Sequence, residues 1–340
     1  MDIKIGKIVI TKDSIPVTIA EAAVEHLGSV KVAMRMAQEA KKIGVDMIKF
    51  QMHIPKEEMV SGLINFWGGS LDEILESYNL TIKDHQLLID YCKEIDIQYL
   101  CTPFCAEAVD VLNELGVEAF KTGSGEMSNF PMMEKLSSTS KPVIISTGMS
   151  TEEEVDDLVK FHKNKKTKFM LMNCTSIYPA PYNSINLKLI HSFTEKYDLL
   201  VGHSDHTPDI WTGVGAAALG ARVIEKHFTL NRSLKGPDYE VSLEPYEFKN
   251  MIEGIKKVHA AKGNNLKVIL DQEIEVRKWA NHSIVAKRKI DKDEVIKRDM
   301  ITVKRPSRGI EAKYFEDIIG CKIKKTINED HFINWEDIQK

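Results

Sequence analysis

Eight short runs with the composition of buried β-strands recur between residues 17 and 228, and they constrain the fold more than any other feature. Stretches with apolar residues at helical spacing separate the runs. Eight strands alternating with helices are typical of an α/β protein of the (β/α)8 TIM-barrel kind. A doubly wound open sheet is the competing fold, but no GxGxxG motif follows the first run. The runs are VTIAEA (17–22), MIKFQM (47–52), IQYLCT (97–102), EAFKTG (118–123), PVIIST (142–147), KFMLMNC (168–174), LLVGHS (199–204) and RVIEKHF (222–228).

Helix signals lie between these runs, where a barrel requires them. Residues 30–43 carry an apolar stripe at helical spacing, and Gly44 follows them as a typical helix C-terminal residue. Thr81 is placed to open the helix before the third run. Ser150 and Glu153 have the spacing of a capping box, which predicts the start of another helix.

The pattern changes after one amphipathic helix expected at residues 245–262. A polar stretch at residues 263–281 is predicted to be a linker, and short strand-like runs with charged turns fill residues 282–340. We therefore expect a catalytic barrel at residues 1–262 and a small, mostly β domain of about 60 residues, near the lower limit of independent stability. Such a domain is expected to depend on a partner surface.

Charge and cysteine content narrow the partners and the compartment. A net charge of −4 and a pI near 6.3 argue against nucleic acid or an anionic membrane as the main partner. The start of the chain has no apolar run of the signal-peptide kind, and the most apolar stretch, residues 213–224, is too short to span a bilayer. Five cysteines without a CxxC pair fit a reducing compartment, so we expect a cytoplasmic protein.

Polar residues end every one of the eight runs, at the edge where barrel enzymes build their active sites. Two lysines are the most informative, because Lys49 interrupts an apolar run and Lys121 follows Ala-Phe. A buried lysine is rare unless it is paired or bound to an anion. With serines nearby, and with Gly123 and Gly125 allowing close backbone approach, these lysines suit a phosphate or carboxylate. Lysines that point away from the barrel are the alternative.

Strand parity separates the two histidines of the GHSDHT sequence. Ser204 and His206 share one face of the seventh run, whereas His203 and Asp205 share the other. His206 and His227 would then end neighbouring strands about 4.8 Å apart, where two neutral imidazoles could bind a divalent metal. Two histidines are too few for a closed zinc site, so ordinary core or loop histidines remain the alternative. A serine-nucleophile triad is not expected, because the GxSxG motif is absent.

Together, these residues resemble the sialic acid synthase (nonulosonate synthase) family along nearly the whole chain. The resemblance implies a TIM barrel followed by a small antifreeze-like (SAF) domain, packed as a domain-swapped homodimer. The matching segments are AEAAVEHLG (20–28), IKFQ (48–51), TPF (102–104), KTGSGE (121–126), STGM (146–149), CTSIYP (174–179), SDHT (204–207), EKHFT (225–229), GPD (236–238) and VKRP (303–306).

The resemblance also implies a reaction. Phosphoenolpyruvate would condense with the open-chain aldehyde of an N-acetylmannosamine-type sugar, releasing phosphate and forming a nine-carbon 2-keto acid. A divalent metal would polarise the aldehyde oxygen. It is most often Mn²⁺, with Mg²⁺ or Co²⁺ as alternatives, and the histidines that match His206 and His227 would hold it.

The resemblance assigns roles to the remaining polar residues. Arg305 would reach the active site of the partner subunit and contact the acyl amide of the sugar. The implied catalytic residues are Glu21, Lys49, Lys121, Glu126 and Asp238. The implied substrate-binding residues are Gln51, Thr102, Phe104, Ser124, Asn173, Ser176, Tyr178, Ser204 and Arg305.

Several positions depart from the family pattern, and they gather where the sugar is expected. The resemblance therefore defines the reaction more closely than the sugar, although the Gly-Pro-Asp segment favours a neuraminate- or legionaminate-like product over pseudaminate. A class I aldolase that forms a Schiff base on Lys49 or Lys121 is one alternative. A non-catalytic sugar-binding barrel is another. The departures are Glu25, Asn231, Tyr239, Ser307 and an aromatic shifted to Trp279.

Overall fold

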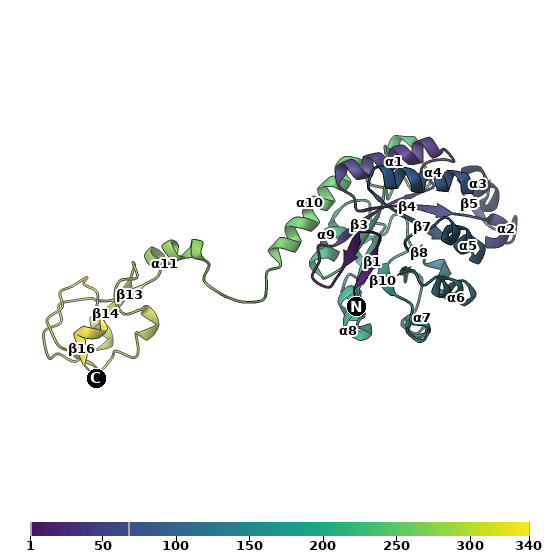
Figure 1. Cartoon of the computed structure of the whole chain (residues 1–340). Helices are drawn as coiled ribbons and strands as arrows, with labels where there is room; N and C mark the ends of the chain where they lie inside the picture. The colour runs from purple at the N-terminus through teal and green to yellow at the C-terminus, as the bar shows by residue number, and fades with distance from the viewer. Residues whose placement is uncertain (1, 67–68, 340) are drawn as a thin grey trace. The chain divides into compact units, whose positions relative to one another are not determined.

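The computed structural model describes residues 2–66 and 69–339, and it divides into two compact units, residues 1–263 and 264–340 (Figure 1). The first unit is the expected barrel. Its eight parallel strands follow the order β7-β4-β3-β12-β11-β10-β9-β8, and β7 packs against β8 across the remaining seam. The strands are β3 (Val17–Ala23), β4 (Met47–Met52), β7 (Gln98–Pro103), β8 (Phe120–Thr122), β9 (Val143–Ser146), β10 (Phe169–Cys174), β11 (Val201–Asp205) and β12 (Val223–His227).

Helices surround this sheet and cover its outer face (Figure 1). The capping signals explain where several begin and end, since Gly44 ends α1 with φ +88° and Thr81 forms a capping box with Asp84. The barrel helices are α1 (Val30–Ile43), α4 (Ile82–Glu94), α5 (Ala106–Glu114), α6 (Phe130–Ser138), α7 (Glu152–Lys165), α8 (Lys188–Tyr197), α9 (Trp211–Ala218) and α10 (Pro245–Ala261). Two shorter helices, α2 (Pro55–Glu58) and α3 (Leu71–Tyr78), follow β4.

One predicted cap is wrong by a residue. The capping box of α7 uses Thr151 and Glu154, not Ser150 and Glu153. Thr151 has the extended backbone of an N-cap, and the Glu154 carboxylate accepts its backbone N–H. Two overlapping Ser/Thr-x-x-Glu patterns occur here, and sequence spacing alone does not separate them.

An antiparallel hairpin that the sequence did not predict precedes the barrel. It consists of β1 (Ile3–Ile5) and β2 (Ile8–Ile10). Its buried isoleucines pack with side chains from the amino-terminal halves of the barrel strands, such as Val17 and Met47. This core fills the lower barrel interior, so the open end is the one at the carboxyl ends of the strands.

The second unit has an isoleucine-rich core of its own. Its helix α11 (Ile274–Ala280) lies within the stretch predicted to be a linker. The run at residues 294–297 contributes only an isolated bridge between Val295 and Lys322. The strands of this unit are β13 (Ser283–Ala286), β14 (Ile301–Lys304), β15 (Lys322–Ile323) and β16 (Ile338–Gln339). In the described parts of both units, no helix is long and apolar enough to cross a bilayer.

Candidate active site

A cavity of about 720 Å³ opens at the carboxyl ends of the barrel strands. Each of the eight strands, or the loop that follows it, contributes to its lining, as the polar strand ends predicted. The sequence-predicted site residues that line it are Glu21, Lys49, Gln51, Thr102, Phe104, Lys121, Ser124, Glu126, Ser176, Tyr178, Ser204, His206, His227 and Asp238.

Two predicted residues are not in this lining. The prediction that Asn173 lines the substrate site is corrected, because this residue lies on the outer face of β10. There its Nδ2 donates to the Ile185 carbonyl at 3.1 Å. Its neighbour Cys174 takes the cavity position, as the alternation of strand side chains requires. Arg305 belongs to the second unit, where its guanidinium lies 5.8 Å from the centroid of the Trp279 ring.

Two lysines and two glutamates form a buried charge cluster at the base of the cavity. Lys49 pairs with Glu21, and its Nζ lies 3.8 Å from Glu225 Oε2. Lys121 Nζ lies 3.5 Å from Glu225 Oε1. Burial alone would lower the pKa of Lys49, but the carboxylates of Glu21 and Glu225 outweigh burial and raise it. Burial dominates at Lys121 and lowers its pKa. The sequence prediction missed Glu225, although it shares a strand face with His227.

A hydroxyl and a carbonyl hold the Lys121 ammonium. Its Nζ donates to Ser146 Oγ at 2.5 Å and to the Thr122 carbonyl at 2.9 Å. The hydroxyls of Ser124 and Ser176 lie so close to Gly148 that a Cβ there would overlap with both. The missing side chain of Gly148 thus leaves room for a hydroxyl-lined cradle beside the ammonium. Such a cradle suits the oxygens of a phosphate or carboxylate.

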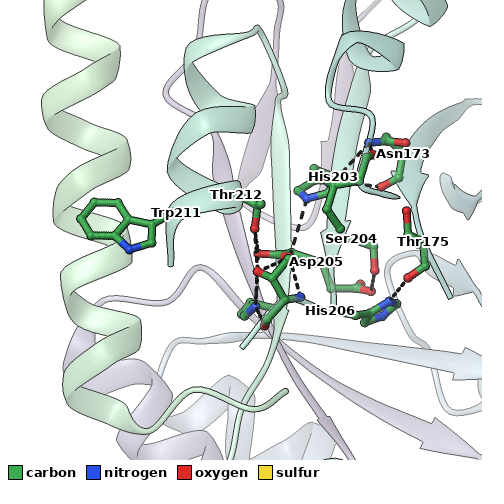
Figure 2. Close-up of polar contacts among 12 residues, drawn as sticks. Asn173, Thr175, His203, Ser204, Asp205, His206, Trp211 and Thr212 are labelled. Atoms are coloured by element: carbon green, nitrogen blue, oxygen red, sulfur yellow. Dashed lines mark hydrogen bonds and ion pairs between the residues drawn. The ribbon is translucent and has the colours of Figure 1, made fainter. Parts of the chain in front are cut away.

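His206 and His227 meet at the rim of this cluster, with ring centroids 5.3 Å apart. His206 Nδ1 is 2.7 Å from the Thr175 carbonyl, which requires a proton on Nδ1 and leaves Nε2 as an acceptor (Figure 2). His227 Nδ1 is buried without a hydrogen-bond partner. Burial, and then the neighbouring His206, hold the pKa of His227 well below its usual range. Within residues 2–66 and 69–339, no three His, Cys, Asp or Glu side chains form a metal cluster by themselves.

Two further carboxyl groups, those of Glu126 and Asp238, line the cavity. Burial raises the pKa of Glu126 to about 7, and its Oε2 has no hydrogen-bond partner. Burial, with the nearby carboxylates of Glu25 and Glu21, raises the pKa of Asp238 to about 7. Both groups could therefore gain and lose a proton near neutral pH.

A second buried network lies behind the histidines, on the far side of strands β11 and β12 (Figure 2). Asp205 accepts hydrogen bonds from the Thr207 hydroxyl at 2.9 Å and the Thr212 hydroxyl at 2.6 Å, and its Oδ2 lies 3.2 Å from Lys226 Nζ. His203 Nδ1 lies 3.1 Å from the Asn173 carbonyl on this same side. The parity prediction is confirmed, since His206 lines the cavity and His203 does not.

A further hydrogen-bonded chain reaches Glu21 from helix α2, and the sequence prediction missed it. Gln51 Nε2 donates to Glu21 Oε1 at 3.0 Å, and Gln51 Oε1 lies 3.0 Å from His53 Nε2. His53 Nδ1 lies 2.9 Å from Glu58 Oε1, and its ring stacks on Phe104. Parity was the available signal, because His53 continues the strand face that carries Lys49 and Gln51.

The fold and the cavity define a class: a TIM-barrel protein with buried lysines, carboxyl groups and histidines in the cavity at its open end. Residues 36–267 match the NeuB family, and residues 281–339 match the SAF domain. The chain therefore belongs to the NeuB family.

Named relatives support this membership over most of the chain. The N,N'-diacetyllegionaminic acid synthase of Campylobacter jejuni is 37% identical over 93% of this chain and 98% of its own. The human N-acetylneuraminate-9-phosphate synthase is 32% identical over 93% of this chain and 90% of its own. The solved N-acetylneuraminic acid (sialic acid) synthetase of Leptospira borgpetersenii has a TM-score of 0.75 and 30% identity, covering 81% of this chain and 95% of that one. The predicted family is thus confirmed, and the protein is an enzyme of this family.

Proposed function

We propose that this enzyme is a nonulosonate synthase. It condenses phosphoenolpyruvate with the open-chain aldehyde of an acylamino-mannose-type sugar, giving a nine-carbon 2-keto acid and phosphate. The observation that carries this proposal is the set of two buried lysines among serine hydroxyls, directly beside a pair of histidines in one cavity. The relatives, which are named as an N,N'-diacetyllegionaminic acid synthase and an N-acetylneuraminate-9-phosphate synthase, support the same reaction class.

Phosphoenolpyruvate has two anionic groups, and the base of the cavity offers partners for both. Lys121 with the hydroxyls of Ser124, Ser146 and Ser176 suits the phosphate, since an ammonium and several hydroxyls can donate to its oxygens together. Lys49 lies across the Glu225 carboxylate from Lys121 and suits the remaining anionic group. We therefore place phosphoenolpyruvate at the base and the sugar towards the rim.

The residues present fit a divalent metal next to this site. Because Nδ1 of His206 faces a carbonyl, Nε2 is the nitrogen of this ring that would act as a ligand. The buried Nδ1 of His227 makes no hydrogen bond, and Asp238 Oδ2 lies 3.5 Å from it. We propose Mn²⁺, with Mg²⁺ or Co²⁺ as alternatives, and further ligands from water or substrate. Such a metal supplies polarisation of the aldehyde oxygen when bound.

The chemistry needs protons to move near the sugar. The C3 atom of phosphoenolpyruvate bonds to the aldehyde carbon, whose oxygen takes up a proton. Water then adds to C2 and loses one proton. The hydroxyl that results loses its own proton as the bond between C2 and the phosphate oxygen breaks, which leaves a ketone and hydrogen phosphate. Glu126 and Asp238 line the cavity, and we assign these proton transfers to them. Glu21 holds the Lys49 ammonium in place through their ion pair.

A substrate panel tests the proposal. The full-length protein is incubated with phosphoenolpyruvate, Mn²⁺ and a set of six-carbon acylamino aldehydes, and phosphate release and product mass are measured. We expect release and a nine-carbon product with at least one sugar. Lys121→Gln should abolish release, whereas Lys135→Gln, at an exposed lysine paired with Asp110, should not. Absence of release with every sugar would reject the synthase function.

One observation favours a second candidate, a class I aldolase. The lowered pKa of the buried Lys121 is typical of a lysine that forms a Schiff base. Borohydride reduction in the presence of substrate would then leave a covalent adduct on Lys121 or Lys49. An activity that EDTA removes, without any adduct, would exclude this candidate.

Assembly and compartment complete the proposal. We propose a domain-swapped homodimer in which Arg305 acts on the sugar in the partner's cavity. The Arg305 side chain is exposed and belongs to the small second unit, whose described strands pair only with one another, and both features fit this role. The unpaired cysteines fit a reducing compartment, and we propose the cytoplasm.

A further inference from the structure

We infer that Glu25, in the loop after β3, is a positioning residue that holds the loop of residues 236–242 and thereby sets the Asp238 carboxyl group in the cavity. The inference rests on the proposed function, in which Asp238 takes part in proton transfer. It deepens that function by naming the group that keeps Asp238 in place. Glu25 departs from the family pattern, so the resemblance does not supply this role.

The Glu25 carboxylate is buried against the loop of residues 236–242. Glu25 is 4% exposed, and its Oε1 accepts a hydrogen bond from the Asp238 backbone N–H at 2.8 Å. The two residues are 213 positions apart in the chain, so this contact joins the loop after β3 to the loop after β12. Without Glu25, the Asp238 N–H would lose its acceptor, and the loop would have to move to find another.

The same carboxylate also contacts the loop at Gly236. A Cβ on Gly236 would overlap with Oε1, Cδ and Oε2 of Glu25, so the carboxyl group lies directly against the glycine backbone. Gly236 does not have a positive φ, and its backbone conformation therefore does not require glycine. Glycine is needed here because it lets the Glu25 carboxylate approach the loop.

The backbone of Asp238 is held on both sides. Its carbonyl accepts hydrogen bonds from the Ser242 hydroxyl at 2.8 Å and from the Ser242 N–H at 3.1 Å, while Glu25 holds its N–H. The Asp238 side chain lines the cavity, with Oδ2 3.5 Å from His227 Nδ1. Ser242 belongs to the same loop, whereas Glu25 connects the loop to the segment that follows β3.

Glu25 is itself fixed by turns of the backbone. The Glu25 N–H donates to the Ala22 carbonyl at 2.9 Å. The Leu27 N–H donates to the Val24 carbonyl at the same distance. These turns directly follow β3, which carries Glu21 of the buried charge cluster. The loop with Asp238 is thus tied to the strand that carries Glu21.

Steady-state kinetics test this role, with phosphoenolpyruvate, Mn²⁺ and a sugar that the substrate panel finds accepted. Glu25→Ala should lower kcat by about 100-fold, because the Asp238 carboxyl group is no longer kept within reach of the reacting atoms. The KM for phosphoenolpyruvate should stay unchanged, because we place this substrate at the lysines, which Glu25 does not hold. Glu25→Gln keeps an acceptor oxygen of the same reach and should retain most of the activity.

The control is Glu253→Ala at an exposed position of α10, which should change neither kcat nor KM. A wild-type kcat in Glu25→Ala would overturn the inference. An equal loss in Glu25→Gln would also overturn it, because the acceptor oxygen would then not be the cause. A KM for phosphoenolpyruvate that rises in step with the fall in kcat would indicate general damage to the barrel and would overturn it too.

A double variant shows whether Glu25 acts through Asp238. Asp238→Asn should itself lower kcat, because the amide cannot transfer a proton. In that background, Glu25→Ala should lower kcat little further, because the carboxyl group that Glu25 positions is already absent. Losses that multiply independently would show that Glu25 acts by another route, and the inference would fail.

The contact at Gly236 gives a test that does not depend on activity. Gly236→Ala should lower the midpoint of urea unfolding of the otherwise wild-type protein, because the new methyl group displaces the Glu25 carboxylate. The same change should have little effect in the Glu25→Ala protein, where this space is free. Gly215→Ala in helix α9, where a Cβ would meet a Leu187 methyl group at 3.3 Å, is the control and should act alike in both backgrounds.

The two kinds of measurement separate the inference from the proposed function. If the wild-type protein uses no sugar of the panel, the synthase function is rejected, and urea unfolding still decides whether Glu25 holds the loop. Equal effects of Gly236→Ala with and without the Glu25 side chain would overturn the inference, whatever reaction the protein catalyses.

Discussion

Glu126 is a buried carboxyl group whose Oε2 has no hydrogen-bond partner in the barrel mouth. Burial raises its pKa from 4.5 to about 7, because the charged form loses more through dehydration than it gains from the Lys121 and Lys49 charges. The folded state therefore favours the protonated form. Its contribution to stability is fully present below pH 4.5 and is lost as the pH rises through about 7.

Glu126→Gln should therefore stabilise the barrel at high pH. We expect a gain of about 2 kcal/mol in unfolding free energy at pH 8.5, and little change near pH 4.5, because a neutral amide does not ionise. Urea unfolding at both pH values measures this. Glu107→Gln on the exposed face of α5 is the matched control. Equal effects of Glu126→Gln at the two pH values would contradict the raised pKa.

Asn173 marks the limit of prediction at the residue scale. Most cavity residues were found because polar side chains at strand ends gather at one edge of a barrel. Asn173 also ends a strand run, but its parity places it on the outer face, beside His203. Lys226 had no comparable signal, because its partner Asp205 lies on the neighbouring strand β11 and the pairing depends on the register of the two strands.

Strands β11 and β12 are joined behind the two histidines by the Asp205–Lys226 pair. Asp205 and Lys226 are register partners, and both side chains are completely buried. His206 follows Asp205 and His227 follows Lys226, with their side chains on the opposite face. The pair thus cross-links the two strands at the point where the two imidazoles lie side by side.

The contributions of Asp205 and Lys226 to the unfolding free energy should be coupled. Asp205→Asn and Lys226→Met should each lower the unfolding free energy by about 3 kcal/mol, because each leaves a buried charge without its partner. The double variant should lose at least ~1 kcal/mol less than the sum of the two. Urea unfolding of the four proteins gives the coupling. Strict additivity would show that the pair does not cross-link the strands.

Element positions were predictable where periodicity extends over several residues. The eight barrel strands and helix α1 follow from their apolar patterns, and most were found within about two residues. The hairpin of β1 and β2 was missed because its three-residue strands carry too little alternation to be seen. The shift of the α7 capping box arose because two adjacent patterns compete, and the structure uses the later one.

The whole molecule consists of two units, each with its own apolar core. The sequence predicted this division from a change of pattern after α10, but it could not place the two units relative to each other. The first part of the second unit exposes many large apolar side chains, which suits an interface with another protein surface. They are Leu266, Val268, Ile269, Leu270, Ile274, Val276 and Trp279.

Subunit mixing tests the assembly at this scale. Arg305→Ala and Lys121→Gln should each be nearly inactive alone. In a domain-swapped dimer, a mixed pair contains one cavity with its own Lys121 and the partner subunit's Arg305. Equal mixing with subunit exchange should then restore about a quarter of wild-type activity, since half of the dimers are mixed and each has one complete site.

The controls decide between action within a subunit and action across the dimer. Mixing Lys121→Gln with a second barrel variant, Lys49→Gln, should restore nothing, because every cavity then lacks a lysine. If Arg305 instead serves the cavity of its own chain, each mixed pair has one cavity without Lys121 and one without Arg305, and mixing with Arg305→Ala restores nothing either. An active site completed by both subunits therefore predicts that activity returns when Lys121→Gln is mixed with Arg305→Ala, and that it does not return when Lys121→Gln is mixed with Lys49→Gln.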